Sequence, residues 1–339
     1  MAQFQVYNSM KAIIPVAGIG TRLRPHTHTQ PKALIPVAGK PILAHIIDSL
    51  ITAGYDEFIF VIGYLGDKIE SYVTTHYSNV KSHFVLQTSG RGVGYAIWLT
   101  KDLVQPDEDI LIVFGDTVVD IDMHAVHQSP YSTVGVKKVE DPRAFGVAEI
   151  DKDGLISKVV EKPEIPKSNM ALVGFYRFKQ AGKLMDALRH LIENNIRTQN
   201  EFYLTDAIMY LIQQGEKFQS VVVDNWFDCG KKGVLLETNS TLLRRMVNLQ
   251  YDNRFENTVI IPPVFIGENC RISNSIIGPN VSIGEDAIVN YSILKNSIIG
   301  PYSHLENTIL QDSLIGNDSV YKGMVQSLNL GDSTEINFG

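Results

Sequence analysis

The 339-residue chain has few cysteines, no long apolar run and no strong positive charge. Its two cysteines, Cys229 and Cys270, are far apart, which excludes a disulfide framework and favours reduced thiols. No apolar run has the length that a bilayer-spanning helix needs, so we expect no membrane association. The start of the chain also lacks the features of a signal peptide, and we therefore expect a cytoplasmic location.

Acidic residues are absent from the first 47 positions, although the whole chain carries a formal net charge of −7. These positions hold the basic residues Lys11, Arg22, Arg24, Lys32 and Lys40. The global acidity, without a basic stripe elsewhere, argues against nucleic acid as a partner. The local excess of positive charge instead predicts a small polyanionic ligand near the start of the chain.

Two kinds of sequence pattern divide the chain, which is long enough for two domains. The first part alternates β-branched runs with segments of helical periodicity. We predict strands at 12–16, 58–62, 110–114 and 134–136, and helices at 41–53 and 95–103. This alternation predicts an α/β domain with a doubly wound, mostly parallel sheet. Gly18, Asp116 and the turn after Ile62 should then share the rim formed by the carboxyl ends of the strands.

The second part repeats a hexad of the form Ile-Gly-x-x-small-x. The five hexads begin at Ile266, Ile277, Ile283, Ile299 and Ile315. Such repeats predict a parallel β-helix of three or four coils, each of about 18 residues, between 259 and 321. An irregular β-sandwich is the alternative. We place the domain boundary between residues 242 and 243, giving domains 10–242 and 243–339.

A glycine-rich turn, Ala17-Gly18-Ile19-Gly20-Thr21-Arg22, follows the first predicted strand. Glycines there allow a phosphate to approach the backbone closely. With Pro31-Lys32 and the stretch 36–42, this turn resembles the signature of the sugar-phosphate nucleotidyltransferases, which make nucleoside-diphosphate sugars from a nucleoside triphosphate and a sugar 1-phosphate. The resemblance runs from Met10 to Ser333. It is closest to the long glucose-1-phosphate thymidylyltransferases, which carry a C-terminal left-handed β-helix.

The resemblance implies a role for each matching residue. The catalytic cations would be Arg22 and Lys32 on the triphosphate and Lys162 on the sugar 1-phosphate. Nucleotide binding would involve Ala17, Gly18, Gly20, Thr21, Gln87 and Gly92, and sugar binding Gly146, Glu161 and Gly174. Asp116 and Asp228 would bind Mg²⁺, a hard cation that takes carboxylate oxygen. Without the resemblance, capping of a turn or a helix is the favoured role for either aspartate.

Several alternatives stay open. Gln87 suits the edge of thymine or uracil, so dTTP and UTP are both candidate substrates. Ala17 replaces the glycine of most thymidylyltransferases and resembles the UTP:glucose-1-phosphate uridylyltransferases, while Phe145 stands where close relatives have tyrosine. A mannose-1-phosphate guanylyltransferase and a catalytically silent regulatory subunit are further alternatives. The β-helix could serve homo-oligomer assembly, which we expect, or regulation or acetyl transfer.

Overall fold

A computed structural model describes residues 10–246, 251 and 254–323. Contacts divide the chain into two compact units. The first comprises Met1–Ile35 and Lys40–Leu235, and the second Pro36–Gly39 and Leu236–Gly339. The division falls within helix α7 (Lys232–Arg245), as does our boundary after residue 242, which stays a prediction.

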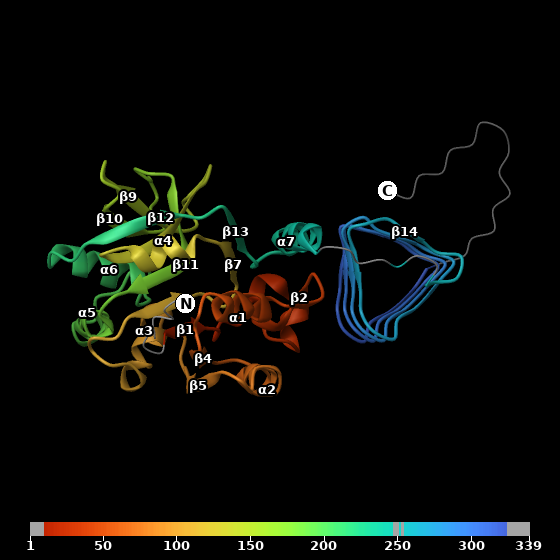
Figure 1. Cartoon of the computed structure of the whole chain (residues 1–339), viewed down its shortest axis with the longest axis horizontal. Helices are drawn as coiled ribbons and strands as arrows, with labels where there is room; N and C mark the ends of the chain where they lie inside the picture. The colour runs from red at the N-terminus through yellow and green to blue at the C-terminus, as the bar shows by residue number, and fades with distance from the viewer. Residues whose placement is uncertain (1–9, 247–250, 252–253, 324–339) are drawn as a thin grey trace, which may run out of the picture. The chain divides into compact units, whose positions relative to one another are not determined.

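A nine-stranded mixed sheet forms the centre of the first unit (Figure 1). Seven strands run in the order β10-β9-β11-β6-β1-β4-β5, β8 pairs with β11, and β12 pairs with β8. Their bounds are β1 (Lys11–Pro15), β4 (Glu57–Ile62), β5 (Lys81–Leu86), β6 (Ile110–Val113), β8 (Ser132–Lys138), β9 (Gly146–Ile150), β10 (Ile156–Glu161), β11 (Met170–Phe178) and β12 (Phe218–Val222). The four predicted strands are confirmed as β1, β4, β6 and β8.

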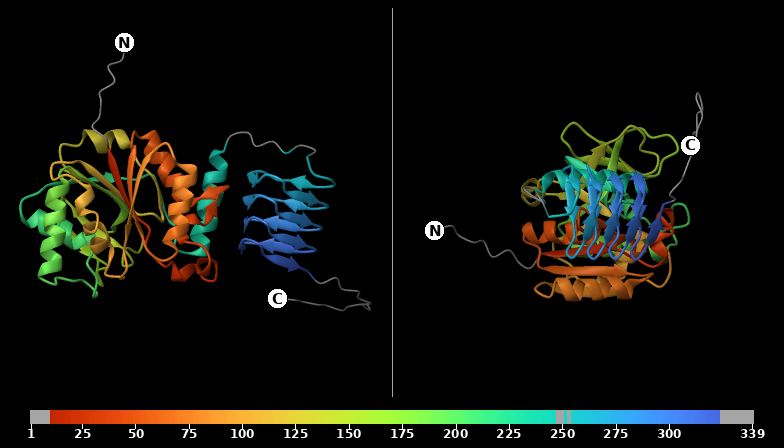
Figure 2. Two further views of the ribbon diagram at one scale, coloured as in Figure 1. Left: turned by 90° about the horizontal axis from the view of Figure 1, so that it is seen from below. Right: turned by 90° about the vertical axis from the view of Figure 1, so that its right-hand side faces the viewer.

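The parallel core of this sheet is β6-β1-β4-β5. Strands β1 and β4 have all but one of their residues buried, as expected of strands covered on both faces. Helices lie on both faces of the sheet (Figure 2), which confirms the doubly wound α/β class. Their bounds are α1 (Ile42–Thr52), α2 (Gly66–His76), α3 (Val93–Trp98), α4 (Met123–Gln128), α5 (Ala181–Glu193) and α6 (Leu204–Gln213).

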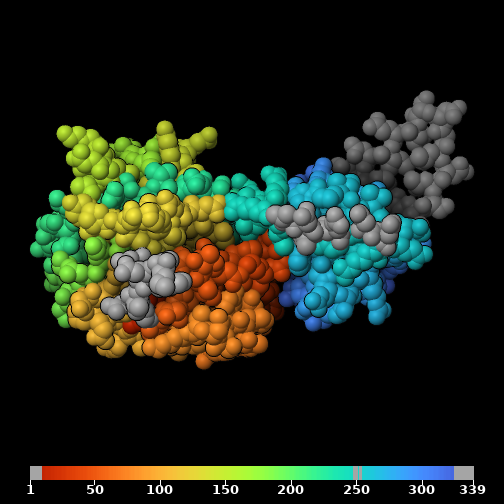
Figure 3. Space-filling view, in the orientation of Figure 1, coloured from red at the N-terminus to blue at the C-terminus, as the bar shows by residue number. Residues whose placement is uncertain are grey.

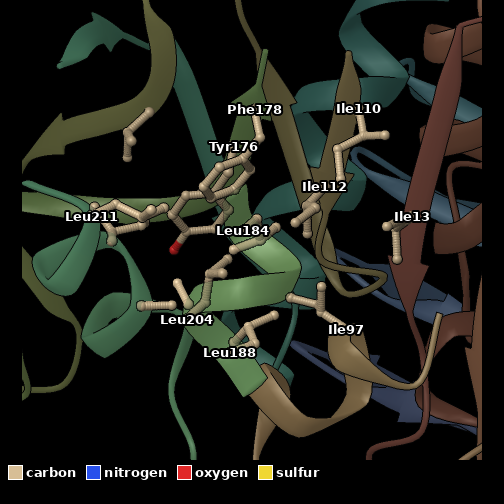
Figure 4. Close-up of a cluster of buried hydrophobic side chains, with 14 of the residues drawn as sticks. Ile13, Ile97, Ile110, Ile112, Tyr176, Phe178, Leu184, Leu188, Leu204 and Leu211 are labelled. Carbon is tan, nitrogen blue, oxygen red and sulfur yellow. The ribbon is translucent and has the colours of Figure 1, made fainter. Parts of the chain in front are cut away.

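Residues 95–103 differ from the single predicted helix: α3 ends at Trp98, and a separate 3₁₀ helix spans Lys101–Leu103. Helices α3, α5 and α6 pack together and bury aliphatic side chains against β6 and β11 (Figure 4). Tyr176, Phe178, Leu184 and Leu188 are at most 3% exposed in this cluster. In the space-filling view, segments from the beginning, middle and end of this unit, coloured orange, yellow and green, together form its visible surface (Figure 3).

The second unit is a parallel β-helix whose coil has a triangular outline (Figure 1). Three four-stranded parallel sheets form its sides, in the orders β14-β17-β20-β23, β15-β18-β21-β24 and β16-β19-β22-β25. The strands are β14 (Val259–Ile260), β15 (Val264–Ile266), β16 (Arg271–Ser273), β17 (Ile276–Ile277), β18 (Val281–Ile283), β19 (Ile288–Asn290), β20 (Ile293–Lys295), β21 (Ile298–Ile299), β22 (His304–Glu306), β23 (Ile309–Gln311), β24 (Leu314–Ile315) and β25 (Val320–Lys322). The predicted β-helix is confirmed, and its left hand stays a prediction.

The coils are shorter than the predicted 18 residues. Val259 pairs with Ile276, 17 positions later, and Ile293 pairs with Ile309, 16 positions later. Corner residues such as Asn274 (φ 52°) and Asp312 (φ 49°) adopt left-handed backbone, which Asn and Asp tolerate better than most residues. The corners are therefore tight turns. Buried aliphatic residues, among them Ile277, Val289 and Leu294 at 0% exposure, fill the interior.

Asn239 of α7 connects three parts of the second unit. Its side chain is fully buried and its Oδ1 accepts hydrogen bonds from the Ala38 N–H at 2.8 Å and the Ser282 hydroxyl at 2.6 Å. Its amide group donates to the Asn280 carbonyl at 3.3 Å. A single buried amide thus satisfies polar groups from a loop and from the β-helix.

Both cysteines are free thiols, as predicted. No helix in the described part of the chain is both long enough and apolar enough to cross a membrane.

Candidate active site

A cavity of about 610 Å³ lies beyond the carboxyl ends of β1, β4, β5 and β6. Gly18 and Gly20 come from the turn after β1, Tyr64 from the turn after β4, and Asp116 from the turn after β6. The predicted shared rim is therefore confirmed. Ala17, Thr21, Lys32, Gln87 and Gly92 also line this cavity, whereas binding of a nucleotide there stays a prediction.

The glycine turn leads into a single 3₁₀ turn, Thr21–Leu23, rather than a longer helix. Pro25 explains its end, because a residue before proline is disfavoured in α conformation and Arg24 is extended (φ −60°, ψ 142°). The Gly20 carbonyl accepts hydrogen bonds from the Leu23 N–H at 3.0 Å and the Thr27 hydroxyl at 2.8 Å. The turn is thus held in place from both sides.

Two aspartates from distant parts of the sequence converge on one cation. The Lys32 Nζ lies 2.5 Å from Asp116 Oδ2 and 3.6 Å from Asp228 Oδ1, and the lysine side chain is only 11% exposed. The antiparallel pair β7 (Thr117–Asp120) and β13 (Asn225–Asp228) brings the acids together, with Asp228 opposite Thr117. The Asp116 carbonyl also accepts the Cys229 N–H at 3.0 Å.

Arg22 reaches the same place. Its Nη2 lies 2.7 Å from the position that a Cβ on Gly230 would take, and Asp228 Oδ1 lies 3.1 Å from that position. Lys32 therefore lies beside both acids, and Arg22 lies near Asp228 at Gly230, whereas their roles in catalysis stay a prediction. Positive side chains next to paired carboxylates can hold both a polyphosphate and a divalent cation.

The donor set fits Mg²⁺. Asp116 and Asp228 keep 36% and 30% of their side-chain surface exposed and already share one positively charged neighbour. No group of three or more His, Cys, Asp and Glu side chains able to hold a metal occurs among the described residues. A metal held here would therefore need further oxygen ligands from phosphate or water, as Mg²⁺ commonly has in nucleotide sites.

A second group of predicted residues gathers where β9 pairs with β10, placing Gly146 opposite Glu161. A Cβ on Gly146 would come within 2.9 Å of Thr205 Cγ2 and 3.1 Å of Glu161 Oε2, so a side chain would crowd this carboxylate. Glu161 accepts a hydrogen bond from the Thr205 hydroxyl at 3.0 Å. Burial raises the pKa of Glu161, and this hydroxyl and Lys162 oppose the rise only in part.

Lys162 follows with a left-handed backbone (φ 40°), and its N–H donates to the Phe145 carbonyl at 3.0 Å. Its Nζ donates to the Tyr203 hydroxyl at 3.1 Å. Burial acts to lower the pKa of the Lys162 ammonium, but Tyr203 and nearby glutamates outweigh it and leave this pKa raised. Lys162 therefore remains a cation at neutral pH.

Gly174 lies at an irregularity of β11, where its carbonyl accepts the Phe114 N–H at 2.9 Å. This contact lies two residues before Asp116. Gly174 thus supports the turn that carries one of the acids, and contact with a sugar stays a prediction. Gln87 lines the cavity, and its amide donates to the Gly92 carbonyl at 3.3 Å, which orients the side chain beside the loop at Gly90 and Gly92.

The segment 201–205 also contributes to the site, although no motif in the sequence indicates it. Glu201 lines the cavity, the Phe202 backbone contacts the loop at Gly92 and Gly94, and Tyr203 and Thr205 bind Lys162 and Glu161. Its one local signal is Tyr203-Leu204-Thr205-Asp206 before an amphipathic run, which resembles an ordinary helix start. Asp122, in contrast, has a structural role, because its carboxylate caps α4 by accepting hydrogen bonds from the N–H groups of His124 and Ala125.

Comparison with known proteins identifies the class. The model of the family described as nucleotidyl transferase matches residues 11–245. The chain therefore belongs to this family of nucleotidyltransferase enzymes, which confirms the predicted enzyme class. Among solved structures, UDP-glucose pyrophosphorylase complexed with UDP-glucose has a TM-score of 0.60 over 70% of this chain and all of that one. At 22% identity this similarity concerns the fold alone.

Among curated proteins, the chain is 36% identical over 253 residues to the bifunctional protein GlmU of Methanocaldococcus jannaschii, covering 74% of this chain. The match spans 59% of the length of that relative. A glucose-1-phosphate thymidylyltransferase of Streptomyces griseus is 30% identical over 321 residues, which cover 93% of this chain and 88% of that one. The predicted resemblance is thus confirmed at the level of the family.

Proposed function

We propose that the protein is a sugar-1-phosphate nucleotidyltransferase that uses dTTP or UTP, with glucose 1-phosphate as the expected acceptor. Two groups of residues carry this proposal, Arg22 and Lys32 beside the two aspartates, and Lys162 beside Glu161. Segment 201–205 contacts the second group and contributes Glu201 to the cavity that Lys32 and Asp116 also line. The two groups suit two phosphorylated substrates. The S. griseus thymidylyltransferase supports this substrate class, and Gln87 supports a pyrimidine.

In the proposed reaction, a phosphate oxygen of the sugar 1-phosphate attacks the α-phosphorus of the nucleoside triphosphate. The bond between the α-phosphorus and the bridging oxygen breaks, and pyrophosphate leaves with the electron pair. Arg22 and Lys32 bind the triphosphate and stabilise the charge that develops on it. Lys162 binds and orients the attacking phosphate, and Glu161 accepts hydrogen bonds from sugar hydroxyls.

Asp116 and Asp228 would hold Mg²⁺, which supplies charge neutralisation on the triphosphate when bound. Lys32 lies beside both carboxylates, and its flexible stem would also allow its ammonium group to contact phosphate oxygens.

The test is a panel of four nucleoside triphosphates against several sugar 1-phosphates with Mg²⁺, read by pyrophosphate release. We expect turnover with dTTP or UTP and glucose 1-phosphate. Asp116→Asn and Asp228→Asn should each abolish it while the protein stays folded, and the cap variant Asp122→Asn is the matched control. Binding of both substrates without pyrophosphate release would favour a regulatory subunit, and absence of binding would overturn the proposal.

A further inference from the structure

Lys162, the proposed ligand of the sugar 1-phosphate, is held by a residue outside the predicted site. Its Nζ donates to Tyr203 Oη at 3.1 Å and lies 5.0 Å from the centre of the Tyr203 ring. The nearest carboxylate oxygen, on Glu161, is 3.9 Å away, beyond hydrogen-bond distance. Because the lysine side chain is 37% exposed and flexible, its direction depends on the tyrosine hydroxyl.

Tyr203 is itself fixed at the start of α6. Its backbone is extended (φ −96°, ψ 150°), and Asp206 lies in the first turn of the helix. Asp206 Oδ1 accepts the Thr198 hydroxyl at 3.1 Å, and Thr198 and Glu201 exchange backbone hydrogen bonds of 3.1 and 2.9 Å. This arrangement closes the loop before the helix and sets the position of the tyrosine.

The preceding residue, Phe202, fixes the same segment to the nucleotide end of the site. Phe202 is fully buried, its N–H donates to the Arg91 carbonyl at 2.9 Å, and its carbonyl accepts the Gly94 N–H at 2.8 Å. A Cβ on Gly92 would lie only 2.5 Å from the Phe202 oxygen, so the two backbones pack without side chains between them. Neighbouring residues of one rigid segment therefore contact both substrate regions.

We propose that Tyr203 is a positioning residue for nucleotidyl transfer: its hydroxyl holds the Lys162 ammonium at a fixed distance from the loop at Gly92. Tyr203 acts through Lys162 and takes no part in bond making. This inference rests on the proposed function, because Lys162 is assigned there to the attacking phosphate. The Phe202 backbone contacts the loop at Gly92 and Gly94, and the next residue contacts Lys162. The conformation of residues 201–205 therefore sets the distance between this loop and Lys162.

The test is a double-mutant cycle with Tyr203→Phe, Lys162→Met and the double variant. Tyr203→Phe keeps the ring and removes the hydroxyl, so kcat/KM for the sugar 1-phosphate should fall about tenfold, the usual order for a hydrogen bond to a charged group. KM for the nucleoside triphosphate and the melting temperature should not change. In the Lys162→Met background, Tyr203→Phe should cause no further loss, because the hydroxyl then has no ammonium to hold.

Tyr210→Phe is the matched control, since Tyr210 lies on the same helix and stacks on His190 at 4.5 Å, away from the site. Unchanged kinetics in Tyr203→Phe would overturn the inference, and so would a further loss in the Lys162→Met background. If the wild type released no pyrophosphate, the proposed function would fail. The role of Tyr203 would then be tested separately, by calorimetric measurement of glucose 1-phosphate binding. Equal affinity of the wild type and Tyr203→Phe, or no binding by either, would contradict this role.

Discussion

Lys32→Met tests the central feature of the site, the cation between two acids. The substitution keeps the length of the side chain and removes the charge that lies 2.5 and 3.6 Å from Asp116 and Asp228. Loss of one partner from a buried ion pair costs about 3–5 kcal/mol. The carboxylates are 36% and 30% exposed, so water recovers part of this energy and we expect a loss of about 1–3 kcal/mol.

The assay is thermal unfolding with and without MgCl₂, in the absence of nucleotide. A loss of about 2 kcal/mol corresponds to roughly 4–8 °C for a unit of this size. Mg²⁺ should raise the melting temperature of Lys32→Met more than that of the wild type, in which the ammonium already neutralises the acids. Turnover should be lost, because Lys32 also binds the triphosphate in the proposed mechanism.

Lys40→Met is the matched control. Lys40 pairs with Asp48 at the surface, where the two side chains are 41% and 43% exposed, and such pairs contribute about 0–1 kcal/mol. If Lys32→Met were as stable as the wild type and responded equally to Mg²⁺, the acids would not form one cation site. The metal assignment of Asp116 and Asp228 would then be wrong.

Three further variants probe other parts of the chain. Gly92→Ala should destabilise the protein by about 1–3 kcal/mol and raise KM for the nucleotide, because φ is +98° and the new Cβ would meet the Phe202 carbonyl. Denaturant unfolding measures the stability, and Gly90→Ala, where a Cβ would meet open space, is the stability control. Asn239→Ala should destabilise the second unit by about 2–4 kcal/mol by leaving buried partners unpaired, measured by hydrogen exchange. Glu161 has a raised pKa, so activity should increase as rising pH ionises its carboxyl group. As pH rises from the ordinary to the raised pKa, the contribution of Glu161 to folding stability should decrease. The pH profile of Glu161→Gln should lack this increase in activity.

Local pattern was sufficient for much of the architecture. The strand at 12–16 and the hexads from Ile266 onward were predictable because burial imposes a period on neighbouring residues. The turn at Gly20 was predictable because its left-handed backbone (φ 69°) favours glycine. The number of residues per coil was not predictable from the sequence. It depends on how tightly the chain turns at corner positions such as Asn274 in the stacked coils.

The sequence by itself determined the alternation of strands and helices in the first part of the chain, the β-helix and the kinds of charged side chain available for phosphate chemistry. Only the tertiary structure decided which of them meet. Lys32 reaches Asp228 through the pairing of β7 with β13, and Lys162 reaches Tyr203 through the packing of α6 beside β10. Such contacts join residues tens to hundreds of positions apart, and no local period or propensity encodes the distance between two side chains that separate elements bring together.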